Sequence, residues 1–235
     1  MKEKNKTRVG VVVAIEINAV LNGYGEPAKI TSSGGYTVRT YDRGGFELVV
    51  VESGAGEISA ATATQMLIDR YDVDLIVNFG VVGALVSTDE LGSGGICVVE
   101  KVIHYDFCTD GWLNLPAGQY PGYSSPFIET DADLMKQALE LLPDSCAVAC
   151  ASADKFVDSA EDKQSLREKT GARICEMEAA GIVLTCRRCG VPCLLIKAVA
   201  DTLTGGGKEF FSELERASIL CFDAVDKVVE KLAKK

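Results

Sequence analysis

The chain has 235 residues, of which 47% are hydrophobic and 25% charged, values typical of a soluble globular protein. Lysine and arginine together number 24 and aspartate and glutamate 34, so the formal net charge is −10. Nucleic acids and anionic membranes require a basic surface, so this balance argues against both as partners. With no repeat, low-complexity segment or linker, the sequence predicts a single domain over residues 1–235.

The nine cysteines are scattered, and most lie in or beside apolar segments, which is typical of reduced cysteine in a cytoplasmic protein. Cys186 and Cys189, with nearby Cys193, leave a metal site as an alternative. However, His104 is the single histidine and no second Cys-x2-Cys pair completes four ligands, so we expect neither a metal nor a cofactor. The first apolar run ends at Glu16 without a cleavage site, and no apolar run reaches the roughly 20 residues of a membrane span.

Short apolar, β-branched runs alternate with longer segments of helical periodicity. The expected strands are residues 9–15, 46–52, 74–79, 95–103, 147–152, 173–176 and 193–200. The expected helices are residues 57–71, 131–142, 160–169, 179–189 and 209–235. Asp131 and Ser159 are the expected N-caps of two of them. This alternation predicts an α/β fold around a largely buried, mostly parallel sheet, with residues 109–127 forming a long loop.

Several expected strands end in a polar residue or a glycine. These residues are Glu16 and Asn18, the run 53–56, Gly80 and Gly83, Asp154, and Asp201. In open α/β sheets, ligands bind beyond the carboxyl ends of the strands, so these signals predict one shared pocket. The alternative is that each is an ordinary turn residue, because turns favour Gly, Asp and Asn.

The segment ICEMEAAGIVLTC places Glu176 and Glu178 inside an apolar run, where charged side chains rarely occur without a partner. In an extended backbone both carboxylates point to the same face, and in a helix they point apart. Glu178 precedes an expected helix, whose dipole favours a carboxylate there. The functional alternative is that a carboxylate accepts two hydrogen bonds from a vicinal diol such as ribose.

Three further segments have both a structural and a functional interpretation. Asp201 is either a turn residue or a partly buried acid whose raised pKa allows proton donation near neutral pH. Phe156 is either a core residue or an aromatic platform for a base. The run SGAGEISAA is a glycine turn leading into a helix, which suits anion binding, but no P-loop lysine follows it.

Together these segments resemble the purine nucleoside phosphorylase/nucleosidase superfamily, and in particular the bacterial 5′-methylthioadenosine/S-adenosylhomocysteine nucleosidases. The resemblance runs through VGVVVAIE, SGAGEISAATATQMLID, DLIVNFGVVGAL, HYDFCTD, ASADKFV, CEMEAAGIV and IKAVADT. It implies a three-layer sandwich around a central mixed, mostly parallel twisted sheet. It also implies a cytoplasmic homodimer of nucleoside metabolism and methionine salvage that hydrolyses a purine nucleoside to base and sugar.

The resemblance implies roles at the purine and at the 5′ substituent. Asp201 would protonate N7, Phe156 would stack on the purine, and the backbone of Val157 would pair with its edge. Phe211 and the loop 109–123 would shape the pocket for the 5′ substituent. The chemistry fits, because a purine leaves poorly until it is protonated, and general acid catalysis supplies about 10²–10⁴-fold.

At the sugar, the resemblance implies that Met177 lines the ribose, Glu178 binds its hydroxyls and Glu176 supports both. Val81 and Gly83 would belong to the same substrate-binding wall. The departing sugar becomes cationic at its anomeric carbon, so a carboxylate beside it is the expected partner of the acid.

The chain departs from the nucleosidase pattern where these enzymes hold their water. Asn18 stands where they carry a glutamate base, Val81 replaces a serine and Ala200 a second serine. Lys197 stands where they carry an arginine of the pocket, so it is expected to be a substrate-binding residue. Because an amide cannot accept a proton, Asn18 is expected to orient a water without deprotonating it. Glu16 is a possible substitute, although its side chain is expected to start from a different direction.

Three functions therefore follow in order. Hydrolysis comes first, because a water attacking a cationic sugar needs little activation. Phosphorolysis comes second, because Asn78 and Val81 stand where phosphorylases carry arginine and serine. A nucleoside- or adenine-binding protein with little catalysis is the third, and Asp201 argues against it.

Overall fold

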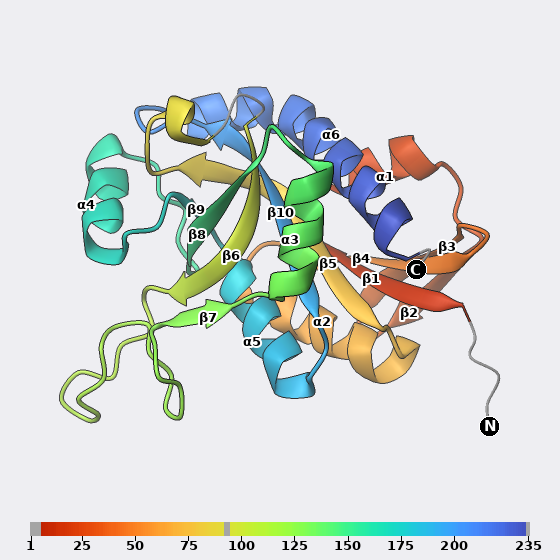
Figure 1. Cartoon of the computed structure of the whole chain (residues 1–235), viewed down its shortest axis with the longest axis horizontal. Coiled ribbons are helices and arrows are strands. Elements are labelled where there is room, and N and C mark those ends of the chain that lie inside the picture. Colours follow the sequence, from red (N-terminus) through yellow and green to blue (C-terminus); the bar gives the residue numbers. More distant parts are fainter. Residues whose placement is uncertain (1–5, 92–94, 234–235) are drawn as a thin grey trace.

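The computed structural model describes residues 6–91 and 95–233 (Figure 1). The chain begins with β1 (Thr7–Val13), α1 (Ile17–Tyr24), β2 (Lys29–Ser33), β3 (Tyr36–Asp42), β4 (Phe46–Glu52), α2 (Glu57–Tyr71), β5 (Leu75–Ala84), a 3₁₀ helix η1 (Thr88–Leu91) and β6 (Ile96–His104). It continues with β7 (Phe127–Glu129), α3 (Ala132–Leu141), β8 (Cys146–Ser152), α4 (Ala160–Thr170), β9 (Ile174–Glu176), α5 (Ala179–Cys189), β10 (Cys193–Asp201) and α6 (Gly207–Leu232).

Each strand and helix expected from the sequence is present in the structure. Both predicted N-caps are confirmed, because the side chains of Asp131 and Ser159 accept hydrogen bonds from backbone amides in the first turns of α3 and α4. The last helix begins at Gly207, and residues 234–235 of its expected range lie outside the described residues. The sequence pattern does not predict α1, β2, β3, β7 or η1.

The third expected strand does not end at Phe79. β5 continues to Ala84, so Gly80 and Gly83 lie inside a strand and not in a turn. A Cβ atom at Gly80 would lie 2.9 Å from Glu16 Oε1, and one at Gly83 would lie 3.1 Å from Asp201 Oδ1. Both glycines therefore leave space for a carboxylate that approaches the strand.

The strands described form one mixed sheet of ten strands, in the order β10-β6-β8-β9-β5-β1-β4-β3-β2, with β7 paired to β6. The central strands β4, β1, β5 and β10 pair in parallel, whereas β2 and β3 continue the sheet in antiparallel fashion. β10 also pairs with β6, so the end of the sheet that contains β5, β10, β6, β8 and β9 closes on itself. This closure brings the ends of β5, β9 and β10 close together.

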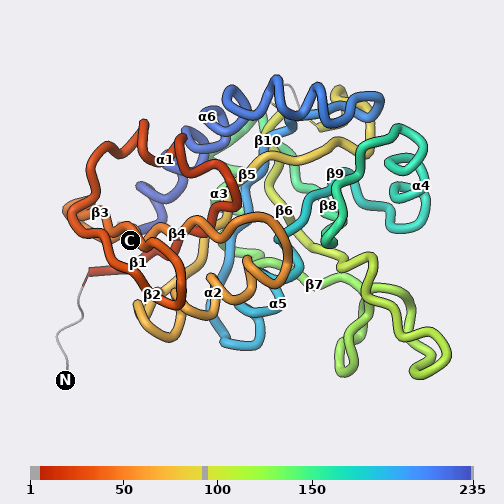
Figure 2. The backbone as a smooth tube through the Cα atoms, turned by 180° about the vertical axis from the view of Figure 1, so that it is seen from behind, coloured from red at the N-terminus to blue at the C-terminus, as the bar shows by residue number. Residues whose placement is uncertain are grey.

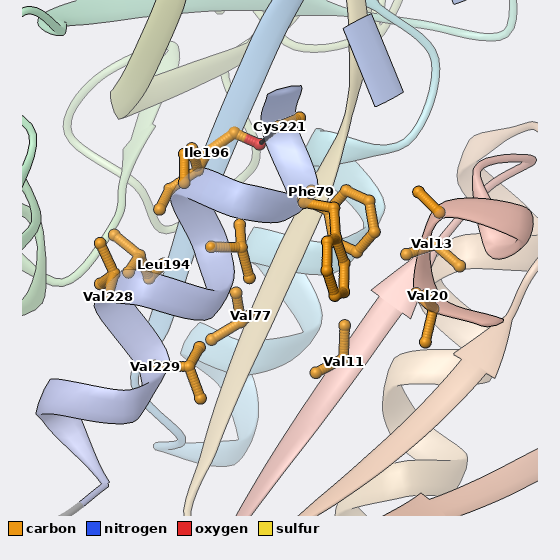
Figure 3. Close-up of a cluster of buried hydrophobic side chains, with 14 of the residues drawn as sticks. Val11, Val13, Val20, Val77, Phe79, Leu194, Ile196, Cys221, Val228 and Val229 are labelled. Atoms are coloured by element: carbon orange, nitrogen blue, oxygen red, sulfur yellow. Dashed lines mark hydrogen bonds between the residues drawn. The ribbon is translucent and has the colours of Figure 1, made fainter. Parts of the chain in front are cut away.

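Helices cover both faces of the sheet, which confirms the three-layer sandwich (Figures 1 and 2). α1, α3 and α6 pack on one face, α2 and α5 pack on the other, and α4 lies at the closed end. Between β5, β10 and α6, the side chains of Val77, Phe79, Leu194 and Ile196 are at most 1% exposed (Figure 3). Such continuously apolar strands are expected when a sheet is covered on both sides.

Residues 105–126 form the expected long loop and extend away from the sheet in both views (Figures 1 and 2). The rings of Phe107 and Tyr120 stack with centroids 4.1 Å apart, and the Tyr120 hydroxyl lies 2.6 Å from Nδ1 of His104. The Arg187 guanidinium of α5 lies 6.0 Å from the Tyr123 ring, so the loop lies on the side of the molecule that carries α5.

The nine cysteines are free thiols, and Cys108 and Cys189 are the exposed ones. Over residues 6–91 and 95–233, no group of three His, Cys, Asp or Glu side chains is arranged to hold a metal ion. None of the helices in these ranges is both long and apolar enough to cross a membrane.

Candidate active site

A cavity of about 190 Å³ lies where the carboxyl ends of β1, β4, β5, β8 and β10 converge. The predicted residues that line it are Val81, Gly83, Phe156, Val157, Glu176, Met177, Glu178, Asp201 and Phe211. Ala14, Ile15 and Glu16 line it from the end of β1, and Ala55 from the turn after β4. Of the polar and glycine signals at the strand ends, Glu16, Gly83, Asp201 and Ala55 of the run 53–56 line this pocket, as the topology rule for such sheets predicts, whereas Asn18, Gly80 and Asp154 do not.

Two predicted site residues do not line this cavity. Asn18 is exposed and lines a neighbouring groove of about 500 Å³, together with Asn22 of α1 and Ser218 of α6. Lys197 is only 1% exposed and lies behind the wall of the cavity, where it donates to Glu176. The cavity and the groove share Ile15, Glu16 and Phe211, so Asn18 lies beside the cavity without lining it.

Glu16 lines both the cavity and the groove that contains Asn18. Its Oε1 accepts a hydrogen bond of 2.9 Å from Val81 N, and its Oε2 accepts one of 2.9 Å from Ile15 N. The approach is possible because Gly80 has no side chain. Each oxygen of the carboxylate has a free lone pair beyond these bonds, so Glu16 can also accept a hydrogen bond from a water or a hydroxyl.

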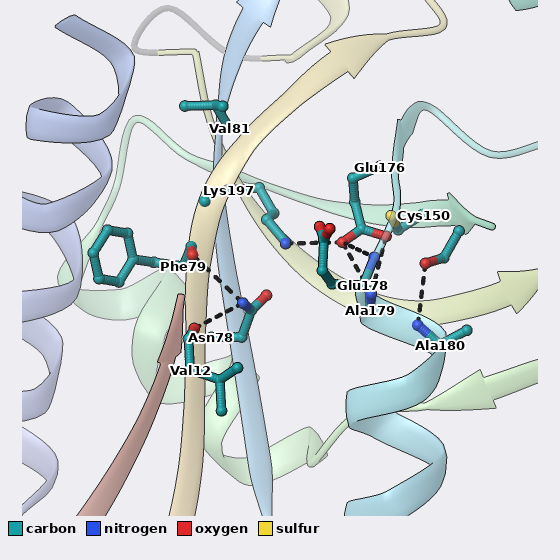
Figure 4. Close-up of polar contacts among 12 residues, drawn as sticks. Val12, Asn78, Phe79, Val81, Cys150, Glu176, Glu178, Ala179, Ala180 and Lys197 are labelled. Atoms are coloured by element: carbon teal, nitrogen blue, oxygen red, sulfur yellow. Dashed lines mark hydrogen bonds and ion pairs between the residues drawn. The ribbon is translucent and has the colours of Figure 1, made fainter. Parts of the chain in front are cut away.

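In the Glu176–Met177–Glu178 corner, the two carboxylates have different hydrogen-bond partners; the contacts of Glu176 are drawn in Figure 4. Glu176 ends β9, accepts hydrogen bonds from the backbone amides of Glu178 and Ala179, and accepts one of 3.1 Å from Lys197 Nζ. It therefore caps α5 and neutralises a buried ammonium. Glu178 faces the cavity and uses Oε1 to accept a bond of 2.9 Å from Gly56 N.

A further carboxylate, Glu57 at the start of α2, lies beside this corner and was not singled out from the sequence. It accepts hydrogen bonds from the Ser152 hydroxyl and from Gly181 N of α5. Burial and the charge of Glu176 raise the pKa of Glu57 to about 8 and that of Glu178 to about 7. Although burial opposes its charge, Glu176 and Glu178 raise the pKa of Lys197. The cluster thus holds a permanent cation and retains a proton near neutral pH.

Asp201 lies at the end of β10 and is 2% exposed. Its Oδ2 accepts a hydrogen bond from Lys163 Nζ of α4, a side chain with no exposed surface. Burial raises the pKa of Asp201, while the bond to Lys163 and its charge lower it. Lys163 was also missed from the sequence, because it lies in EDKQSLREK, which has the pattern of an exposed helix.

Aromatic side chains form the wall beside Asp201. Phe156 is 41% exposed, and its ring meets the Phe210 ring edge to face with centroids 5.3 Å apart. Phe211 follows at 70% exposure, with its ring 5.4 Å from that of Phe210. Such half-open rings can stack on a planar ligand while one face stays packed against protein.

The glycine turn before α2 is already occupied by protein carboxylates. Glu178 accepts from Gly56 N, and Asp154 accepts a bond of 2.8 Å from Glu57 N. Asp154, which follows β8, is therefore a cap for α2. The amides that would suit a bound anion are not available to a phosphate.

The loop 109–123, expected at the 5′ substituent, does not line this cavity within the described chain. It extends from the side of the molecule that carries α5 (Figure 2). Ile15 and Phe211 line both this cavity and the neighbouring groove that contains Asn18.

Comparisons with known proteins agree with this geometry. The family model described as the phosphorylase superfamily matches residues 8–233 of this chain. The chain is 31% identical over 203 residues to the 5′-methylthioadenosine/S-adenosylhomocysteine nucleosidase of Staphylococcus saprophyticus, covering 84% of this chain and 86% of that protein. A solved nucleosidase of the same kind from Helicobacter pylori, in complex with butyl-thio-DADMe-Immucillin-A, has a TM-score of 0.89 at 25% identity, over 97% of this chain and 100% of that chain. The futalosine hydrolase of Helicobacter pylori has a TM-score of 0.88 at 25% identity, over 96% of this chain and 98% of that chain.

Proposed function

This chain belongs to the phosphorylase superfamily, and on that premise we propose that it hydrolyses the N-glycosidic bond of a purine nucleoside. The proposed substrates resemble 5′-methylthioadenosine or S-adenosylhomocysteine, on which its relatives are named to act. The observation that carries the proposal is the presence in one cavity of a buried acid, Asp201, and two further carboxylates, Glu16 and Glu178.

In the proposed reaction, Phe156 stacks on the purine and Asp201 gives its proton to N7. The C1′–N9 bond breaks, its electron pair stays on the purine, and the sugar becomes cationic at C1′. Glu178 accepts hydrogen bonds from the sugar hydroxyls, and Met177 packs against the ribose. Glu176 and Lys197 act behind the cavity, where they fix the corner that carries Glu178.

We propose that Glu16, and not Asn18, holds the attacking water. The water oxygen bonds to C1′ and its proton passes to Glu16, which later returns it to solvent. Glu16 is supported in this role because it lines the cavity and is fixed by two amides, whereas Asn18 lines the neighbouring groove.

Water is better supported than phosphate as the nucleophile. Glu16, Glu176, Glu178 and Asp201 line the cavity, against one lining ammonium, Lys155, which lies 3.7 Å from Asp162. Lys197 lies behind the wall and is paired with Glu176. A phosphate dianion beside these carboxylates would be repelled, and the amides before α2 are already bonded. Phosphorolysis remains the second candidate function, and ligand binding without catalysis the third.

A direct test follows the release of free purine from 5′-methylthioadenosine, S-adenosylhomocysteine and unsubstituted purine nucleosides, with and without phosphate. We expect release without phosphate. Asp201→Asn should lower kcat about 10²–10⁴-fold while substrate still binds, and Glu16→Gln should lower it in the same direction. Asn18→Ala is the matched control and should keep kcat within about twofold of the parent protein. Release that requires phosphate, or full activity of Asp201→Asn, would contradict the proposal.

We also propose that the protein acts as a cytoplasmic homodimer with a role in methionine salvage. Support for the dimer comes from Ile58 and Trp112, which are 76% and 80% exposed on α2 and on the long loop. Large apolar side chains left in solvent favour a protein partner.

A further inference from the structure

Lys163 is a buried charge that the proposed reaction does not use. It lies in the first turn of α4, and its side chain has no exposed surface. Burying an ammonium is costly unless it is paired and fully hydrogen-bonded. A buried lysine therefore indicates that its charge has a specific role at the group with which it is paired.

The ammonium of Lys163 has an acceptor for each of its three N–H groups. Besides Asp201 Oδ2, it donates to Thr202 O at 2.6 Å and to Gly205 O at 3.1 Å. An ammonium has three donors and no acceptor, so none is left for a substrate. Lys163 can therefore act on a ligand only through Asp201.

The contact with Lys163 also decides which oxygen of Asp201 is free. Oδ2 is held by the ammonium, whereas Oδ1 is the oxygen nearer to Gly83, which lines the cavity: a Cβ atom there would lie 3.1 Å from Oδ1 and 3.5 Å from Oδ2. The absence of a side chain at Gly83 keeps this oxygen accessible. A proton on Oδ1 is thus directed toward the bound purine.

The turn that follows Asp201 is fixed by the same elements. Glu209 of α6 accepts hydrogen bonds from Thr202 N and from its hydroxyl, at 3.0 and 2.9 Å. Asp158, just before α4, accepts one of 2.6 Å from Gly207 N. The segment of Phe156, which lines the cavity and would stack on the purine, leads directly into α4. Lys163 of α4 therefore connects Asp201 to the segment that would bind the purine.

We propose that Lys163 is the positioning residue of the general acid: it holds Asp201 Oδ2 and stabilises the carboxylate that forms when Oδ1 gives its proton to the purine. This inference rests on the proposed function. The proton moves from Asp201 Oδ1 to N7, and the negative charge left on Asp201 is met by an ammonium that does not have to move. A fixed charge of this kind lowers a barrier without reorganisation during the reaction.

The groups that face Asp201 set the direction of the pH effect. Lys163 favours the carboxylate, whereas Glu209, Asp158 and the Cys175 thiol of β9 face it without a positive charge. Among the described groups that face Asp201, removal of Lys163 leaves Glu209 and Asp158, which with burial favour the protonated acid. Asp201 then holds its proton to higher pH and is a weaker acid.

The test compares Lys163→Met with the parent protein and with Lys169→Met, an exposed lysine on the same helix. We expect Lys163→Met to lower kcat about 10–100-fold and to move the alkaline limb of kcat/KM upward by about 1–3 pH units. Binding of a 7-deazapurine nucleoside, which has carbon in place of N7, should change less than about threefold. Lys163→Arg should restore much of the alkaline limb, because it restores the charge.

A double variant separates a positioning role from a general structural one. If Lys163 acts through Asp201, adding Lys163→Met to Asp201→Asn should lower kcat no further than Asp201→Asn alone. An additive loss in the double variant, or an unchanged alkaline limb in folded Lys163→Met, would overturn the proposal.

A carbon-13 NMR titration of the Asp201 carboxyl, assigned with Asp201→Asn, tests the pairing without any turnover. We expect its pKa to be higher in Lys163→Met than in the parent protein. If the parent releases no base from any nucleoside, the proposed function fails while this titration still decides whether Lys163 controls the protonation of Asp201. Equal titration curves would overturn the pairing alone.

Discussion

Single buried carboxylates in this protein differ in what surrounds them, and the difference determines their roles. Glu176 has a lysine partner and two backbone amides, so it is the fixed charge of the corner. Glu57 has a hydroxyl and one amide, with no cation in contact among residues 6–91 and 95–233. Glu176 contacts the Lys197 ammonium and Glu57 does not, so Glu57 is the carboxylate that retains a proton.

Glu57 should make the stability of the protein depend on pH. The folded protein keeps the Glu57 proton up to a pKa of about 8, whereas the usual value is 4.5. Between these values the folded state binds more protons than the unfolded state, so the free energy of unfolding falls as pH rises. Glu57→Gln cannot ionise, and its amide can still accept from Gly181 N and donate to Ser152.

We therefore expect urea unfolding of Glu57→Gln to show a smaller loss of stability from pH 5 to pH 8, by about 1–3 kcal/mol. Glu52→Gln, at an exposed position in the same part of the chain, is the control and should keep the parental slope. A parental slope in Glu57→Gln as well would show that Glu57 is ionised in the folded protein.

At the scale of helices and strands, α4 connects the segment of Phe156 to Asp201, which its Lys163 contacts. Ser159 caps this helix by accepting a bond of 3.0 Å from Asp162 N, one residue before the position of Lys163. Loss of an N-cap typically costs about 0.5–2 kcal/mol. Because this first turn carries Lys163, the same loss should also loosen the support of Asp201.

Ser159→Ala should therefore lower the free energy of unfolding by about 1 kcal/mol and lower kcat modestly, by about two- to fivefold. Thermal unfolding followed by circular dichroism and steady-state kinetics measure the two effects. Ser165→Ala, a change of the same type within the body of α4, is the control and should change neither by much. A destabilised Ser159→Ala with parental kcat would mean that the first turn of α4 does not transmit its order to Asp201.

Elements with strong local signals were predictable from the sequence, and those held by tertiary contacts were not. The boundaries of β4 and α2 match their predicted ranges, because an apolar run and a helical repeat meet at a glycine turn. α1 has no side-chain cap, and β2 is a polar strand at the edge of the sheet with exposed residues, so neither has a clear pattern. These elements form because the neighbouring strands and α6 offer them a surface.

The residues of the site were predictable in the same way: those with a local sequence signal could be found, and those placed by tertiary contacts could not. Asp201, Glu178 and Phe156 could be predicted because each follows or ends a recognisable strand in a motif. Lys163 could not, because its partner is 38 residues away and its own segment is mostly charged. Which of Glu16 and Asn18 lines the cavity depends on where α1 begins, and a short uncapped helix gives no sequence signal for that.

For the whole molecule, charge and exposed apolar surface act in opposite directions. A net charge of −10 on each copy opposes self-association, although salt screens it. Ile58 and Trp112 offset this repulsion if they are buried between two copies. The long loop, which lines no part of its own cavity, lies on the same side as α5 and is free to contact a second copy.

We accordingly expect light scattering to give twice the chain mass of 25.0 kDa at micromolar concentration, with a dimer that tightens as salt is raised. The double variant Ile58→Ser/Trp112→Ser removes apolar surface without adding charge, and should raise the dissociation constant at least about tenfold. Ile30→Ser is the control of the same type, because Ile30 is 60% exposed on β2, at the end of the sheet opposite to β6 and the long loop (Figure 1). A monomeric parent protein would show that there is no such interface. Equal weakening of the dimer by Ile30→Ser would place the interface elsewhere. If the dimer holds and the double variant keeps its kcat as a monomer, the cavity is complete within one chain.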